Sequence, residues 1–270
     1  MKRRAYELFI SIRSILPLRV CLLVAAMAGL RTLSSPFLLM PGQTIGSVLT
    51  ETLGGPVWDM FIGIDASMDW LLALMPPLTG LVIYIQRAAG PHQVFTLHRN
   101  QSMWRWMLQK LILLFFYAFV CTFLMAGTII LISWLYGMKG LYVFAQDAKG
   151  FLSMQYYQPL LSMLCFSLQS LMLMLIFQWV YLVSGSVSWS VVAFMLPVIW
   201  GLMSGSSDEN PRSIHVFINW GLFSRYTRTE GMFGVPVAWG LVRQAGLVAV
   251  LMLANLLSSP FIRQDRKRRV

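Results

Sequence analysis

Charged residues are scarce in this sequence. They make up 11% of its 270 residues, whereas hydrophobic residues make up 57%, and a soluble domain carries about a quarter charged residues. A chain with so little charge cannot cover a water-facing surface, so a soluble globular fold is excluded. Several apolar runs reach the roughly 20 residues that a helix needs to cross a bilayer. The composition therefore predicts an integral membrane protein that crosses the bilayer several times.

Cysteines are also few, and the common catalytic motifs are missing. The three cysteines all lie in apolar runs, so they form neither a disulfide framework nor a CxxC metal pair. No GxxxxGKS/T phosphate loop is present, so the chain does not bind ATP by that device. HExxH and GxSxG are absent as well, and the three histidines are too dispersed for a metal site. No catalytic residue, metal ligand or cofactor of this chain is predicted.

Six apolar runs are predicted to span the membrane, so we expect an all-α fold in a single transmembrane domain, residues 1–270. The spans cover about residues 18–38, 69–86, 109–136, 157–183, 187–204 and 236–259. Most of the 21 lysines and arginines flank these runs on the side that holds both termini. Because positive charge stays on the cytoplasmic side, both termini are predicted to be cytoplasmic. Topology thus explains the net charge of +11 without a nucleic-acid partner.

Three segments outside the spans have their own character. Residues 1–17 carry an apolar stripe opposite a polar face, which is typical of a helix lying in the membrane interface; a plain extension of the first span is the alternative. Residues 205–235 begin a helix near Pro211, followed by an apolar run too short to span, which predicts a re-entrant or interfacial outer helix. The outer segment 39–68 is acidic and rich in glycine and proline. Its carboxylates favour a cationic peptide as ligand or are ordinary solvated groups.

Polar residues and prolines within the spans are candidates for a translocation path. Arg31 lies about 18 Å above Arg19 along a helix, and a charge at that depth needs a partner or a watery cavity. It either lines a path or extends to the outer interface. Arg243, a turn or two inside the last span, raises the same question. Pro76 and Pro77 remove backbone donors from the second span and make either a hinge or a packing kink.

The stretch "TLHRNQSMWRWMLQKLILLFF", residues 96–116, crowds cations and indoles before the third apolar run. Trp104 and Trp106 fit the aromatic belt of a membrane interface, and Arg105 with Lys110 fits the positive-inside rule. These rules explain most of the composition of this stretch.

They do not explain the length of the cytoplasmic segment 87–108, because the other inner loop is only the tight turn at residues 184–186. A segment of that length can hold a short helix that protrudes toward a soluble partner.

The layout resembles the membrane subunit of an ABC-2 type ABC transporter. Six spans with both ends inside, an amphipathic first helix, a basic inner segment before span three and a half-inserted outer helix before span six all fit this family. The run "HRNQSMWRWMLQKL", residues 98–111, resembles the base, indoles and lysine that lead into the third span of such bacterial permeases. Those positions are here Arg99, Trp104, Trp106 and Lys110.

The resemblance implies a permease of the bacterial inner membrane that exports peptides of the bacteriocin or lantibiotic type, lipids or drugs. It implies a second permease subunit, identical or related, and two separate ATPase subunits that bind ATP and Mg. The segment 87–108 would include a coupling helix held by the ATPase. The residues implied to contact the ATPase are His98, Arg99, Gln101, Trp104 and Arg105.

Two other classes of protein remain open from the sequence. An integral-membrane enzyme acting on lipid or peptide needs polar groups in or above the spans, and Arg31, Glu51, Asp69 and Arg243 are the available ones. They provide no pairing of base and nucleophile. A membrane immunity protein that sequesters a toxic peptide at the outer face is the other alternative.

Overall fold

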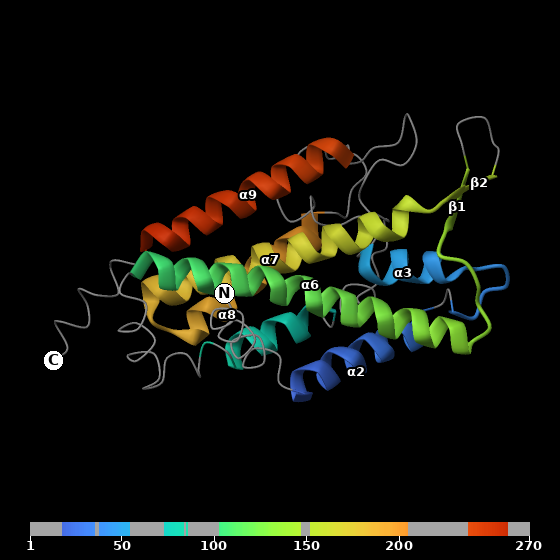
Figure 1. The fold of residues 1–270 in the computed structure, drawn as a ribbon, viewed down its shortest axis with the longest axis horizontal. Helices are drawn as coiled ribbons and strands as arrows, with labels where there is room; N and C mark the ends of the chain where they lie inside the picture. Colours follow the sequence, from blue (N-terminus) through green and yellow to red (C-terminus); the bar gives the residue numbers. More distant parts are fainter. Residues whose placement is uncertain are drawn as a thin grey trace, which may run out of the picture.

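In the computed structural model the chain forms a bundle of long helices with a small β-hairpin at one end (Figure 1). The structure describes residues 18–35, 38–54, 73–83, 85, 103–146, 152–204 and 237–258. The labelled helices are α2 (Leu18–Ser34), α3 (Ile45–Gly54), α6 (Met103–Leu135), α7 (Tyr157–Ser184), α8 (Val187–Ser204) and α9 (Val237–Ser258). The strands are β1 (Val143–Gln146) and β2 (Leu152–Gln155). A further helix, Ala73–Ile83, is teal and unlabelled in Figure 1.

Helix α7 organises the bundle, because it contacts α3, α6, α8 and α9, while α2 packs mainly against α6. The helices run roughly side by side (Figure 1), which defines two ends. The hairpin end holds the β1–β2 hairpin and α3. The turn end holds the start of α6, the α7–α8 turn and the end of α9, where the Trp179 indole donates to the Ser258 hydroxyl at 3.0 Å.

Three helices in the described part of the chain are long and apolar enough to cross a membrane. They are Trp104–Leu135, Tyr157–Ser184 and Trp239–Ser258. The helices Ala73–Ile83 and Val187–Trp200 are apolar but shorter, and α2 has 17 residues. Each predicted span therefore contains a helix, and the total of six spans stays a prediction. The predicted surface helices, 1–17 and 205–235, lie outside the described residues.

The described part of the chain is mostly helical, as predicted, and differs from an all-α fold in one small element: β1 and β2 form an antiparallel hairpin with Val143 opposite Gln155. This hairpin joins α6 to α7. Its strands have four residues each, and apolar runs of that length are too short to be recognised as membrane spans. The turn between α7 and α8 was predicted correctly at residues 184–186. Gly185 adopts φ 67° there and its N–H donates to the Tyr181 carbonyl at 2.9 Å, which ends the helix.

Two helix boundaries also differ from the prediction. Helix α6 begins at Met103 instead of near residue 109, because helical hydrogen bonding continues beyond the apolar run. Helix α3 lies inside the outer segment 39–68, where no helix was predicted. Its start has a local signal: Ser47 N–H donates to Thr44 Oγ1 at 3.2 Å while Thr44 N–H donates to Ser47 Oγ at 3.0 Å. This reciprocal pair resembles a capping box with serine in place of glutamate.

Candidate functional site

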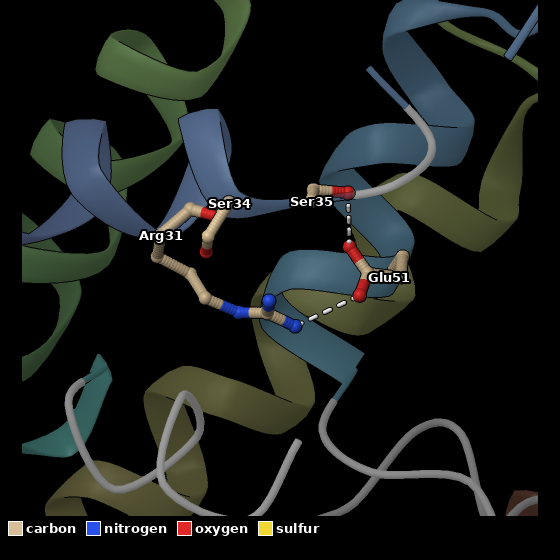
Figure 2. A network of polar contacts seen from close by, with 4 residues as sticks. All are labelled: Arg31, Ser34, Ser35 and Glu51. Carbon is tan, nitrogen blue, oxygen red and sulfur yellow. Dashed lines mark hydrogen bonds and ion pairs between the residues drawn. The ribbon is translucent and has the colours of Figure 1, made fainter. Parts of the chain in front are cut away.

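A charged network at the hairpin end joins α2 to α3 (Figure 2). Arg31, in the last turn of α2, donates from Nη2 to Glu51 Oε1 at 2.8 Å. The Ser35 hydroxyl donates to the other carboxylate oxygen, Glu51 Oε2, at 2.9 Å. Both oxygens of the carboxylate are therefore engaged, one by a cation and one by a neutral hydroxyl.

Burial of the two charges is unequal. The Arg31 side chain is 8% exposed and that of Glu51 is 23% exposed. A buried arginine among apolar helices is costly without a partner, and Glu51 compensates its charge. The partial negative charge of the helix dipole at the C-terminal end of α2 also favours a cation. The sequence raised the need for a partner of Arg31 without naming one, since the two residues come from different segments.

Helix α3 is attached to the α6–β1 connection as well as to α2. Gly46 N–H donates to the Gly140 carbonyl at 3.2 Å, and the Thr44 hydroxyl donates to the Tyr142 carbonyl. Gly46 is required at this approach, because a Cβ there would lie 2.5 Å from the Tyr142 carbonyl oxygen. The start of α3 is thus fixed to backbone, while its middle is held by Glu51.

The turn end carries part of the predicted ATPase contact. Trp104 is 47% exposed, whereas Trp106 is 4% exposed and packs in the core. Lys110 Nζ lies 3.7 Å from the centroid of the Trp106 ring, a cation–π contact. Arg105 is exposed beside them on α6. His98, Arg99 and Gln101, the other predicted contacts, lie outside the described residues.

The remaining path candidates each have a separate neighbour. The Tyr117 hydroxyl donates to the Pro76 carbonyl at 3.2 Å, so the proline-containing helix is joined to α6. Pro77 is in the same helix, which continues without a break to Ile83. The Arg243 guanidinium lies 3.5 Å from the ring centroid of Trp239, one turn earlier on α9. These contacts do not gather the path candidates into one site.

Within the residues that the structure describes, no group of three His, Cys, Asp or Glu side chains is arranged to hold a metal ion. Glu51 is engaged with Arg31, so these two members of the set considered for an enzyme face each other as an ion pair. Asp69 lies outside the described residues. The contacts of Glu51 with Arg31 and Ser35 compensate a buried charge and attach α3 to α2.

Comparison of the chain with protein-family models, characterised proteins and solved structures gave no match. In the part of the chain that the structure describes, the fold is that of a helical protein with three helices long and apolar enough to cross a membrane. Its function must be inferred from its own residues.

Proposed function

We propose that this chain is the membrane-spanning permease subunit of an ATP-driven exporter of the ABC-2 type, in a bacterial inner membrane. It acts with a second permease subunit and with separate ATPase subunits that bind ATP and Mg. The turn end faces the cytoplasm, together with both termini. The cargo is a peptide of the bacteriocin or lantibiotic type, a lipid or a drug.

The observation that carries this proposal is the start of α6. The helix has 33 residues, which is about 50 Å at 1.5 Å per residue. The hydrocarbon core of a bilayer is about 30 Å thick, so α6 is long enough for its first turns to extend beyond it. Trp104 and Arg105 are exposed on these turns, while Trp106 fixes them to the bundle.

A rigid helix that carries exposed indole and guanidinium groups out of the membrane suits contact with a soluble protein. Tryptophan and arginine are the residue types that contribute most in protein interfaces. A movement of an ATPase at this point is passed directly into α6, which contacts α2, α3 and α7. This supports a force-receiving element at the turn end.

The test is purification of the tagged chain from its native host in a mild detergent, with mass spectrometry of the proteins that accompany it. We expect a soluble ABC ATPase to co-purify. Deletion of residues 92–102, which leaves α6 intact from Met103, should abolish the association. Trp104→Ala should weaken it without lowering the yield of folded chain.

Phe115→Ala is the matched control, because Phe115 is also an exposed aromatic residue of α6, at 40%, but lies further into the apolar part of the helix. It should leave the association unchanged. If the unaltered chain brings no ATPase, the proposal is wrong, and the membrane enzyme and the immunity protein become the leading alternatives. Equal loss in Trp104→Ala and Phe115→Ala would contradict the assignment of Trp104 as a contact.

A further inference from the structure

The residues that connect α6 and α7 to the β1–β2 hairpin are aromatic and exposed. Trp134 and Tyr136 lie at the end of α6, and Tyr156 and Tyr157 lie at the start of α7. Their exposed fractions are between 53% and 63%. Tryptophan and tyrosine are enriched where a membrane-spanning helix reaches the lipid headgroups, because an apolar ring there carries a polar N–H or O–H group. These four residues are therefore typical of a membrane boundary at the hairpin end.

The length of α7 agrees with a second boundary at the turn end. Tyr157 and the exposed Trp179 both belong to α7, and they lie about 33 Å apart at 1.5 Å per residue. The hydrocarbon core of a bilayer is about 30 Å thick, so the two aromatic residues fit its two surfaces. Trp189, near the start of α8, is exposed at the same end as Trp179. An α7 that crosses the bilayer therefore puts the start of the hairpin at the level of the headgroups.

One face of the hairpin continues this exposed aromatic surface. Met154 and Tyr156 are both exposed, and the Tyr156 hydroxyl donates to the Met154 sulfur at 3.8 Å. The ring of Tyr142 packs edge-on against that of Tyr156, with 5.6 Å between the ring centroids. Tyr142, Met154 and Tyr156 thus form one continuous surface, which we call the hairpin face.

The contacts of the hairpin with the helix bundle leave much of this face uncovered. Each strand has four residues, and an isolated two-stranded hairpin is marginally stable at best in water. β1 contacts α3, and the Gly140 and Tyr142 carbonyls accept hydrogen bonds from the Gly46 N–H and the Thr44 hydroxyl. These hydrogen bonds attach the backbone before β1 to the start of α3. The side chains of Met154 and Tyr156 stay exposed, so a further surface is needed to cover them.

The charge of the connecting segment suits phospholipid headgroups. Lys139, between α6 and β1, is exposed, and the segment 134–160 contains two lysines and one aspartate. A lysine at this level binds lipid phosphate with its ammonium group, while neighbouring aromatic rings enter the apolar layer beneath. The cation and the apolar face therefore match the two layers of a membrane surface.

We propose that the β1–β2 hairpin lies on the membrane, with the hairpin face set into the headgroup region of the phospholipids. With the turn end in the cytoplasm, as in the proposed function, this is the outer leaflet. Because the backbone before β1 is bonded to the start of α3, the lipid surface also fixes the position of α3. The placement of the hairpin depends on neither an ATPase nor a cargo, so it goes beyond the proposed function.

The experiment measures the depth of single residues in a bilayer. Met154→Cys is made in a chain whose three cysteines are replaced by alanine, labelled with the fluorophore NBD and placed in lipid nanodiscs. Quenching by phospholipids with a nitroxide near the headgroup is compared with quenching by phospholipids with a nitroxide near the end of the acyl chain. The label at position 154 should be quenched at least about threefold more by the first kind than by the second, as for a group at the membrane interface.

Two positions in the same background are matched controls. Val143 pairs with Gln155, and neighbouring residues of a strand point to opposite faces, so Val143→Cys places the label opposite Met154. Its quenching by the headgroup nitroxide should be less than about half of that at position 154. Phe123, exposed within the apolar part of α6, is the deep control. The label of Phe123→Cys should be quenched more by the acyl-chain nitroxide.

Each other outcome would overturn the proposal. Equal quenching at positions 143 and 154 would show that the hairpin face is not the side that meets the lipid. No quenching at position 154 would place the hairpin in water, or against protein such as a second copy if the emission is shifted to the blue.

Two provisions keep the result interpretable. If the cysteine-free chain does not fold, Met154→Cys in the original chain gives the same comparison after subtraction of the label that the original chain takes up, since Cys121 and Cys165 are buried. Co-purification of the ATPase is measured separately, so failure here leaves the proposed function standing.

Discussion

Replacing Gly80 with alanine should destabilise the contact between the helix Ala73–Ile83 and α6. A Cβ at Gly80 would lie 1.8 Å from Tyr117 Oη and 2.6 Å from Tyr117 Cζ. Tyr117 is 1% exposed, and its hydroxyl is fixed by the hydrogen bond to the Pro76 carbonyl at 3.2 Å. The buried ring would overlap the added Cβ, so either the tyrosine changes rotamer or the two helices separate.

The size of the effect follows from three contributions to the free energy of unfolding. Overpacking a well-packed core costs about 1–3 kcal/mol. Loss of the Tyr117 hydrogen bond costs about 1 kcal/mol. Alanine regains about 1 kcal/mol over glycine in a helix interior. The net destabilisation is about 2 kcal/mol, which lowers the unfolding temperature of a chain of this size by about 4–8 °C.

The assay is thermal unfolding of the purified chain in a mild detergent, followed by tryptophan fluorescence. Gly127→Ala is the control, because Gly127 is also in a helix, α6, but a Cβ there meets nothing within 4 Å. It should leave the unfolding temperature unchanged or slightly raised. Equal unfolding temperatures for Gly80→Ala and Gly127→Ala would refute the reasoning.

A second variant separates the clash from a general effect of the substitution. Tyr117→Leu removes the hydroxyl oxygen and the ring carbon that a Cβ at Gly80 would meet. In that background Gly80→Ala should cost less than half of its cost in the original chain, because the contact that couples the two sites is gone. An undiminished cost would mean that the destabilisation arises elsewhere.

Three further predictions concern other contacts. Thr52→Val removes a buried hydroxyl that lacks a partner in the described part of the chain and keeps the side-chain shape, so hydrogen exchange in α3 should slow; faster exchange would contradict the argument. The Gln244 amide donates to the Cys165 carbonyl at 3.3 Å and to Gln169 Oε1 at 3.4 Å. Gln244→Met should therefore lower the free energy of unfolding by about 1 kcal/mol. The unfolding temperature should fall by about 2–4 °C. An unchanged unfolding temperature would show that the amide does not join α9 to α7. Trp106→Ala should lower the free energy of unfolding by about 3–5 kcal/mol, because Trp106 is 4% exposed. Trp104→Ala should leave the unfolding temperature nearly unchanged, because Trp104 is 47% exposed. Similar losses of stability in the two variants would contradict the burial of Trp106.

Local properties of the chain were sufficient to predict where most helices form. An apolar run of about 20 residues favours a helix because every backbone polar group is then satisfied within the segment. The local sequence is enough to predict the start of α2, the position of α7 and the turn at Gly185. So does the membrane character, since it depends on composition alone.

The start of α6 and the helix α3 were harder to predict for a physical reason. The two tryptophans, Trp104 and Trp106, are typical of a membrane interface. Which of them is buried, however, depends on which side of α6 faces the bundle. Helix α3 is short, and short helices owe their stability to the surfaces that cover them more than to their own propensity. The Thr44 and Ser47 pair was the available local signal.

The pairing of distant residues was decided by the tertiary structure. Arg31 lies in a predicted span and Glu51 in a predicted outer segment, so the sequence gives no reason to pair them. They meet because α3 packs beside α2. The need for glycine at position 80 likewise arises only when Tyr117 reaches across from α6. Composition and apolar pattern act between neighbours along the chain, whereas ion pairs and close approaches depend on how the helices pack. The sequence therefore identified a membrane chain with a charged residue in need of a partner, and packing supplied that partner on a helix that the pattern did not reveal.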